Sequence, residues 1–383
     1  MIYADHAATT RISESALRVY DDVCCSDFGN PSSLYADGRK ARAVLEQARR
    51  EVADCLGADP VGVIFTSGGS ESDNCAIRAA AALGRAQGKC HLISTQFEHH
   101  AVLHTLRKLE REGYSVTLLA PDREGFIHPE QVEEAITPDT ALVSVMTANN
   151  EIGTIQPAAE IGEVCRRHGV LFHTDAVQAA GHIPVHFRDM HADFLALSAH
   201  KFEGPRGTGA LLVRPGLAVE PLIEGGGQER GRRAGTENTA GIAAMAAALR
   251  ENCAQMAERS ARVADLRDRL IDAVLQIPGS HLNGSRKKRL PGNASFVFEG
   301  IESESLLLLL DSAGIEASTG SACSAGSVEP SHVLLSIGVP EQLAHGSLRL
   351  TLGPENTEQE IDEIAETLRS LVEELRENVG ENP

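Results

Sequence analysis

Residues 170–201 decide the fold class, and they read VLFHTDAVQAAGHIPVHFRDMHADFLALSAHK. Two short apolar runs in this stretch, 170–173 and 193–197, have the length and composition of buried strands. Polar residues follow both runs: Asp175 and Gln178 after the first, and Ser198, His200 and Lys201 after the second. Side chains beyond the carboxyl ends of strands in an open α/β sheet converge on one crevice, where ligands bind. We therefore expect Asp175 and Lys201 to face the same small molecule, although taken alone the two are more simply explained as a buried ion pair.

Strand and helix patterns alternate along most of the chain. Strands are expected at 61–65, 91–94, 116–119, 141–145 and 207–213, with helices such as 99–111 and 157–168 between them. This alternation predicts an α/β protein with a mostly parallel sheet that is covered by helices on both faces. Two helical stretches, at about 241–250 and 261–276, mark the domain boundary. We expect a large domain of residues 1–255, whose N-terminal residues can pack with the other domain, and a smaller α/β domain of residues 256–383.

The composition narrows the class of protein. The chain has 383 residues, of which 42% are hydrophobic, and this is enough to bury the cores of two domains. Its formal net charge of −19 disfavours polyanion binding, and 4% aromatic residues without Trp argue against stacking on nucleic-acid bases. No apolar run has the length of a membrane span, and the start, MIYADHAATT, lacks the features of a signal peptide. Eight cysteines without a C-x-x-C pair indicate neither a zinc site nor a disulfide framework, so we expect a cytoplasmic enzyme.

The run Ser67-Gly68-Gly69-Ser70-Glu71-Ser72 lies between a predicted strand and the next helix. Glycines let the backbone approach a ligand closely, and a helix N-terminus offers free N–H groups and the positive end of the helix dipole. The run therefore predicts a phosphate cradle, although an ordinary strand–helix turn with a Ser cap fits the local sequence equally well. It lacks the lysine of a P-loop and the G-x-G-x-x-G spacing, which argues against a nucleoside triphosphate or a dinucleotide.

Two further polar motifs could also supply ligand-binding groups. In the run EHHAVLH at 98–104, His100 and His104 stand four residues apart and could hold a metal, but the sequence offers no third ligand. A single histidine that faces the crevice is the favoured interpretation. Asn149 and Asn150 follow a predicted strand, where a ligand-binding amide fits at least as well as a turn-forming one.

The run Gly320-Ser321-Ala322-Cys323-Ser324-Ala325-Gly326-Ser327 contains a cysteine without apolar neighbours to bury it. Most lone cysteines are small buried hydrophobes. A thiol on an accessible loop is instead a candidate nucleophile. We therefore predict that Cys323 carries chemistry and that the other seven cysteines are core or inert surface residues.

Seven runs, taken in order, carry a family resemblance: SGGSES, EHHAV, NNEIG, HTDAVQA, SAHK, GGGQERGRRAGTEN and STGSACSAGSVEPSHV. Over essentially its whole length the chain resembles the NifS/IscS-like cysteine desulfurases, which are pyridoxal-phosphate enzymes of the class V aminotransferase family. The resemblance implies a large domain with the type I PLP-transferase (aspartate aminotransferase-like) fold, pyridoxal 5′-phosphate (PLP) as cofactor and L-cysteine as substrate. It also implies a homodimer, an iron–sulfur scaffold protein as sulfur acceptor, and no direct binding of nucleic acid or membranes. No metal is expected in the resting enzyme, with Cys323 as a transient iron–sulfur ligand.

The resemblance assigns the chemistry to a few residues. Lys201 would hold the cofactor as a Schiff base, Asp175 would pair with its pyridinium nitrogen, and His99 would stack on its ring and transfer protons. Arg349 would bind the carboxylate of the substrate, because its planar guanidinium suits that group. Cys323 would take the sulfur of the substrate as a persulfide, which leaves alanine.

The remaining contacts implied by the resemblance bind the cofactor. Asn150 and Gln178 would bond the ring hydroxyl or the substrate. The phosphate would be bound by Gly69, Ser70, Ser198, His200 and, from the partner subunit, Thr236. Position 70 is Ser where many relatives have Thr, and both supply a hydroxyl. Residues 5–8 read DHAA where relatives often carry Asn, which puts a substrate contact there in doubt.

The expected function is therefore conversion of L-cysteine to L-alanine, with transfer of sulfur for iron–sulfur cluster assembly. An aminotransferase or a selenocysteine lyase on the same fold, and a sulfur donor for tRNA thiolation, remain alternatives. A non-catalytic sulfur carrier or scaffold is disfavoured, because it needs neither Lys201 nor Cys323. A metal-binding protein, with a site built on His100 and His104, is the remaining alternative to an enzyme of this family.

Overall fold

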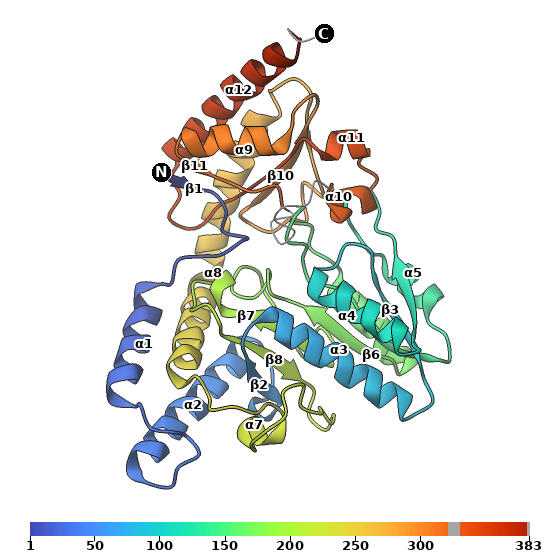
Figure 1. The fold of residues 1–383 in the computed structure, drawn as a ribbon, viewed down its shortest axis with the longest axis vertical. Coiled ribbons are helices and arrows are strands. Elements are labelled where there is room, and N and C mark those ends of the chain that lie inside the picture. The colour runs from blue at the N-terminus through green and yellow to red at the C-terminus, as the bar shows by residue number, and fades with distance from the viewer. Residues whose placement is uncertain (321–329, 381–383) are drawn as a thin grey trace.

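The computed structural model describes residues 1–320 and 330–380 of the chain. A seven-stranded sheet with the strand order β2-β8-β7-β6-β5-β3-β4 runs through the larger of its two lobes (Figure 1). The strands are β2 (Val63–Thr66), β3 (His91–Thr95), β4 (Ser115–Leu119), β5 (Thr140–Ser144), β6 (Leu171–Asp175), β7 (Phe194–Ser198) and β8 (Gly209–Val213). Strands β3 to β7 pair in parallel, whereas β8 pairs antiparallel with β2 and β7. The predicted mostly parallel α/β sheet is confirmed.

Helices cover both faces of this sheet because alternate side chains of its strands are apolar on each face. The helices of the large lobe are α1 (Glu14–Ser26), α2 (Ala36–Cys55), α3 (Gly69–Arg85), α4 (His100–Arg111), α5 (Pro129–Ala135), α6 (Ala158–His168) and α7 (Gln228–Gly231), with short 3-10 turns η1 (Pro60–Gly62) and η2 (Ala199–Lys201). On one face, Leu142 and Phe194 pack in a core with residues of α3 and α4. On the other face, Val143, Phe172 and Leu195 pack in a core with residues of α2 and α6.

The smaller lobe is built on an antiparallel sheet with the order β12-β10-β9. Its strands are β9 (Ser280–Leu282), β10 (Asn293–Phe298) and β12 (Ser347–Thr351), and its helices are α9 (Ser303–Ser312), α10 (His332–Ser336), α11 (Glu341–Ala344) and α12 (Glu358–Gly380). The N-terminal strand β1 (Ile2–Tyr3) pairs in parallel with β11 (Ile315–Glu316), and Ile2 is buried in the core of the small lobe. The first residues of the chain therefore belong to the small lobe by packing.

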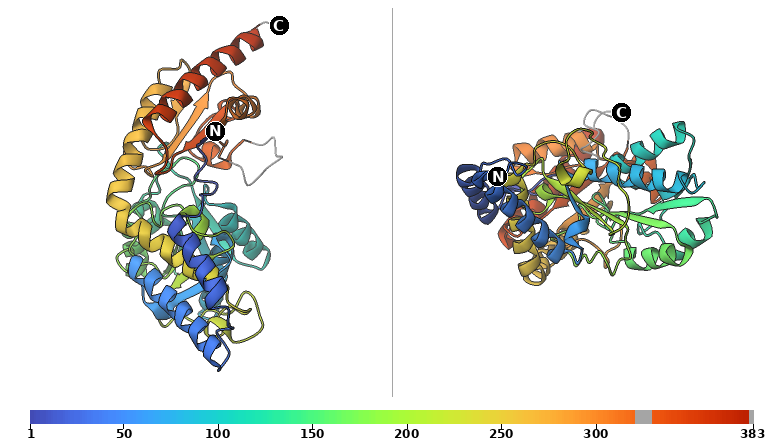
Figure 2. Two further views of the ribbon diagram at one scale, coloured as in Figure 1. Left: turned by 90° about the vertical axis from the view of Figure 1, so that its left-hand side faces the viewer. Right: turned by 90° about the horizontal axis from the view of Figure 1, so that it is seen from below.

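One helix, α8 (Thr239–Val274), connects the two lobes (Figure 2, left). Its 36 residues are continuous, whereas the sequence suggests two separate helical stretches. Side chains from Ile242 to Leu249 pack in the core of the large lobe, and those from Val263 to Val274 pack in the core of the small lobe. The boundary predicted between residues 255 and 256 falls inside α8, between these two groups of side chains. Neither α8 nor another helix of the described residues combines the length and the hydropathy that a membrane span requires.

Candidate active site

The carboxyl ends of β6 and β7 open into a cavity of about 330 Å³. The predicted site residues that line it are Gly69, Ser70, His99, Asn150, Asp175, Gln178, Ser198, His200, Lys201 and Arg349. Arg349 reaches the cavity from β12, so the site lies between the two lobes. Thr236 is exposed and does not line the cavity. Cys323 lies outside the described residues, but Gly320, three positions before it, is part of the lining.

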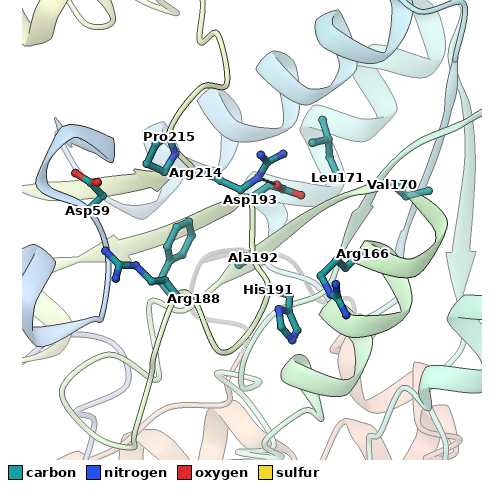
Figure 3. Close-up of a pocket in the computed structure, with 12 residues that line it drawn as sticks. Asp59, Arg166, Val170, Leu171, Arg188, His191, Ala192, Asp193, Arg214 and Pro215 are labelled. Atoms are coloured by element: carbon teal, nitrogen blue, oxygen red, sulfur yellow. Dashed lines mark hydrogen bonds and ion pairs between the residues drawn. The ribbon is translucent and has the colours of Figure 1, made fainter.

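A larger cavity of about 660 Å³ lies at the opposite, amino ends of β6 and β7 (Figure 3). Among the residues that the structure describes, its lining includes Arg166, Arg188, His191, Asp193 and Arg214, but none of the predicted site residues and no lysine. We therefore assign the candidate site to the smaller cavity at the carboxyl ends.

The phosphate cradle predicted at 67–72 is the start of α3. Gly68 has φ 153°, a conformation that favours glycine, and a Cβ on Gly69 would lie 2.6 Å from Cγ2 of Val177. Gly69 and Ser70 also line an adjoining space of about 370 Å³, together with Ser198 and His200. The amino end of a 17-residue helix thus opens onto a space that suits a phosphate group.

Two groups in this region were missed by the sequence analysis. Arg206 lines the same space, and its Nε lies 3.4 Å from Oγ1 of Thr9, which also lines it. A basic side chain near an expected phosphate is a recognisable signal, and the run KFEGPRG after Lys201 contains it. Thr9 has no such signal, because its contact with Arg206 joins residues that are 197 positions apart.

Lys201 enters the cavity from η2, directly after β7. Its Nζ donates to the carbonyl oxygens of Ala7 at 2.6 Å and Ala8 at 2.8 Å. Its own carbonyl oxygen lies 2.7 Å from Nε2 of the His182 ring. The DHAA run at 5–8 therefore contributes backbone carbonyls to the site, and backbone carbonyls leave no signature in a sequence.

Asp175 and His99 have pKa values that burial displaces in opposite directions. Burial raises the pKa of Asp175 to about 6, while the N–H of Val177 at 2.8 Å and the charge of Lys201 lower it. Burial and then Lys201 lower the pKa of His99 to about 4. Because Nδ1 of His99 accepts the N–H of Ala101 at 3.1 Å, the proton of this neutral ring sits on Nε2. Both residues are therefore able to gain or lose a proton within the cavity.

Arg349 is held by hydrogen bonds of both its Nη atoms but keeps hydrogen-bonding capacity. Its Nη2 donates to Oδ1 of Asp5 at 2.8 Å, and its Nη1 donates to the carbonyl oxygen of Asn150 at 3.0 Å. Its Nε is buried and has no hydrogen-bond partner among the described residues. A carboxylate bound beside Arg349 would satisfy this donor. Asp5 was not predicted as a site residue, because its partner is 344 positions away in the sequence.

The histidines of α4 give no support to the metal alternative. The rings of His100 and His104 stack with centroids 4.9 Å apart, and the ring of His332 lies 4.8 Å from that of His100. However, within residues 1–320 and 330–380 no group of three or more His, Cys, Asp or Glu side chains could hold a metal ion. His99, the neighbour of this cluster, lines the cavity, whereas His100 and His104 are not among its described lining residues.

The residues of the cavity fit PLP by their chemistry. The amino end of α3 suits the phosphate, the Asp175 carboxylate suits a pyridinium nitrogen, and the Lys201 amine suits an aldehyde carbon. These three groups come from three separate elements, α3, β6 and η2, and all line one cavity.

Comparison with known proteins agrees with this fit. The family model described as Aminotransferase class-V matches residues 2–364. The chain is 48% identical to cysteine desulfurase IscS of Methanosarcina thermophila over 375 residues, which are 98% of this chain and 93% of that protein. It also superposes on a solved NifS-like protein with a TM-score of 0.91 at 34% identity, covering 97% of this chain and 99% of that one. For the solved structure of SspA in complex with cysteine, the TM-score is 0.83 at 37% identity, over 93% of this chain and 100% of the other. The chain therefore belongs to the class-V aminotransferase family, whose cofactor here is PLP, and within that family to the NifS/IscS-like cysteine desulfurases.

Proposed function

We propose that this enzyme converts L-cysteine to L-alanine and retains the sulfur on Cys323. One observation carries the proposal: a single cavity collects Lys201, Asp175, Arg349 and the amino end of α3, and Gly320 lines it as well. In the sequence, Gly320 opens the run that contains Cys323, which lies outside the described residues. The carbonyl of Gly320 also lies 3.5 Å from Nη1 of Arg349.

In this proposal each residue has a limited task. Lys201 attaches the cofactor, Asp175 keeps its ring nitrogen protonated, and His99 carries a proton on Nε2 at the cavity wall. Bound PLP supplies an electron sink for bonds at the α-carbon of the substrate. Arg349 orients the substrate through its carboxylate. Gly69, Ser70, Ser198 and His200 would hold the phosphate of the cofactor, and Asn150 and Gln178 would bond the ring hydroxyl or the substrate.

The sulfur transfer balances without an added oxidant. The Sγ of Cys323 forms a bond to the sulfur of the substrate as the Cβ–S bond of the substrate breaks. The carbon that loses sulfur takes up a proton and becomes the methyl group of alanine. One enzyme thiol and one cysteine thus become one enzyme persulfide and one alanine.

Substitution of Cys323 tests the proposal. Cys323→Ser should bind PLP with an unchanged absorbance spectrum but release almost no alanine, because the sulfur acceptor is missing while the cofactor site remains. Mass spectrometry after a single turnover of the unmodified enzyme should place one additional sulfur on the peptide that contains Cys323. Cys24→Ser is the matched control at an exposed cysteine and should keep full activity. Sulfur found on a different cysteine would overturn the assignment, and formation of 3-mercaptopyruvate in place of alanine would favour an aminotransferase.

We further propose iron–sulfur cluster assembly as the destination of the sulfur. The relatives named IscS motivate this choice. Persulfide labelled with radioactive sulfur and incubated with native extract should move first to an iron–sulfur scaffold protein. Transfer to a tRNA-thiolating protein would redirect the proposal without affecting the desulfurase chemistry.

A homodimer with shared active sites is the last part of the proposal. Thr236 is exposed. The chain just before it is held in place by Glu229, whose two carboxylate oxygens accept hydrogen bonds from Arg49 at 2.7 and 2.9 Å. Nearby Leu222 and Ile223 are also exposed, at 42% and 40%. An exposed segment of this kind suits a subunit interface.

Mixed subunits test the shared site. A Lys201→Ala chain and a Thr236→Ala chain should each be weakly active alone, yet their heterodimer should regain one intact site. Sedimentation should show a dimer in the same buffer. A monomer that binds PLP at full strength would contradict this part of the proposal.

A further inference from the structure

Three carboxyl groups are buried at the floor of the candidate cofactor cavity. Asp73 on α3 is 1% exposed, Glu98 is 0% exposed, and Asp175 at the end of β6 is 7% exposed. Asp73 and Asp175 line the cavity, and Glu98 is near enough to both for the charges of all three to interact. Like charges in a buried site disfavour one another, so the three carboxyl groups will not all be ionised.

The three groups differ in how well the protein supports a negative charge. Asp175 accepts the N–H of Val177 at 2.8 Å and faces Lys201. Glu98 accepts the N–H of Met146 at 2.9 Å and the hydroxyl of Thr95 at 3.0 Å. Asp73 accepts no hydrogen bond of standard geometry from the described residues, and its Oδ1 is buried without a partner. Hydrogen bonds to a carboxylate favour its charged form, so Asp73 is the least supported place for a charge.

The imidazole of His173 lies close to Asp73 but cannot offset a charge. Nε2 of His173 lies 3.4 Å from Oδ1 of Asp73 and is itself a buried atom without a partner. The other ring nitrogen, Nδ1, lies 2.8 Å from Oγ of Ser144. His173 is 0% exposed, and burial lowers the pKa of its ring to about 3. The ring is therefore neutral, and it can accept a hydrogen bond at Nε2 when Nδ1 donates to Ser144.

We propose that Asp73 is protonated at neutral pH and acts as a positioning residue, donating its proton towards Nε2 of His173 and leaving Asp175 as the charged carboxyl group at the cofactor ring. This arrangement pairs two otherwise orphaned atoms, Oδ1 and Nε2, and links α3 to β6 beneath the cavity. It also removes one like charge from beside Asp175. Burial, together with the charges of Asp175 and Glu98, raises the pKa of Asp73 well above its usual value. The role at the ring rests on the proposed cofactor site, whereas the protonation itself does not.

Infrared spectroscopy of the full chain tests the protonation directly. The difference spectrum between the unmodified protein and Asp73→Asn at neutral pH should contain the C=O band of one protonated carboxyl group. Glu98→Gln is the control, because burial raises the pKa of Glu98 to about 8 and that residue should give a separate band. Loss of carboxylate bands alone in Asp73→Asn would overturn the proposal.

The pH dependence of stability gives a second test in the absence of cofactor. A carboxyl group with a raised pKa in the folded protein stabilises it most below the unfolded pKa of about 4, and this contribution is lost as pH rises through the folded pKa. Asparagine has nearly the same shape as a protonated Asp73 and does not titrate. The melting temperature of Asp73→Asn should therefore rise relative to the unmodified protein as pH increases from about 4. A relative fall over that range would show an ionised, stabilising Asp73 and contradict the proposal.

The PLP-loaded protein provides the test of the positioning role. The pH at which the absorbance of bound PLP changes should be the same in Asp73→Asn as in the unmodified protein. If Asp73 were ionised, its replacement by Asn would shift the pH of this absorbance change by about one to three units. Asp175→Asn is the control that removes the charge and should shift the transition. If the unmodified protein fails to bind PLP, the proposed cofactor site is wrong, but the infrared and stability results still decide the protonation of Asp73.

Discussion

The two ends of the central sheet hold cavities of opposite character. The cavity at the amino ends of β6 and β7 is about 660 Å³, twice the size of the one at the carboxyl ends (about 330 Å³), and its buried acid, Asp193, is fully engaged. One oxygen of Asp193 accepts the N–H of Phe172 at 2.8 Å and the other is paired with Arg214 (Figure 3). At the carboxyl ends, buried atoms of Asp73 and Arg349 lack partners. A buried polar atom without a partner costs free energy, and a bound ligand can recover that cost. Unpaired buried atoms therefore indicate the ligand-binding cavity better than the volume of the cavity does.

The largest effect expected from this comparison concerns Lys201. Lys201→Ala should abolish covalent attachment of PLP, because no other lysine of the described residues lines the cavity. Borohydride reduction followed by peptide mapping measures the attachment, which should occur at position 201 in the unmodified protein. Lys287→Ala, at an exposed lysine, is the control and should retain the label. A label on a different lysine would remove the functional distinction between the two ends of the sheet.

Asp175 should give the next largest effect. Asp175→Asn removes the charge that holds a proton on the ring nitrogen, so kcat should fall by about 10²–10³-fold. Since burial raises the pKa of Asp175 to about 6, the carboxylate loses its charge as pH falls through that value, and PLP should bind more weakly below it. Titration of cofactor-free protein with PLP at several pH values measures this. Equal affinity above and below pH 6 would argue against contact between Asp175 and the ring.

The corresponding substitution in the cavity at the amino ends of the strands, Asp193→Asn, should lower stability and leave catalysis intact. Asp193→Asn leaves the guanidinium of Arg214 without its carboxylate and weakens the bond to the N–H of Phe172. We expect a loss of roughly 1–3 kcal/mol in the free energy of unfolding, measured with urea, because a buried hydrogen-bonding group loses its partner. The folded variant should keep its kcat. A large loss of kcat without loss of stability would mean that the amino-end cavity takes part in the reaction.

The smallest effect is expected at Arg188, which lines the amino-end cavity but is exposed. Its recorded hydrogen bond joins Nη2 to the carbonyl of Ala58 at 3.2 Å. Arg188→Ala should change the free energy of unfolding by less than about 0.5 kcal/mol and should leave KM for L-cysteine unchanged. A clear rise in KM would indicate that the larger cavity communicates with the substrate site.

The parts of the site that the sequence predicts are those governed by sheet geometry. Asp175 is the last residue of β6 and Lys201 lies in η2, the turn after β7, and neighbouring parallel strands must bring their carboxyl ends together. Asp73 was missed because it lies within the first turns of α3, where an acidic residue is typical of a solvated face. The carbonyls of Ala7 and Ala8 were missed because backbone groups carry no side-chain pattern. The role of Thr236 stays a prediction, since its predicted target belongs to the partner subunit.

The continuous helix α8 also limits how the protein can move. It is roughly 54 Å long at 1.5 Å per residue, and its two halves belong to different cores. A hinge motion at this helix would have to break backbone hydrogen bonds of α8 or pull its side chains out of one of the two cores. We therefore expect α8 to hold the two lobes at a fixed orientation. The distance between Lys201 in one lobe and Arg349 in the other then depends partly on α8, which connects the lobes. A change in the course of α8 between its two halves would therefore change which substrates fit between these two side chains.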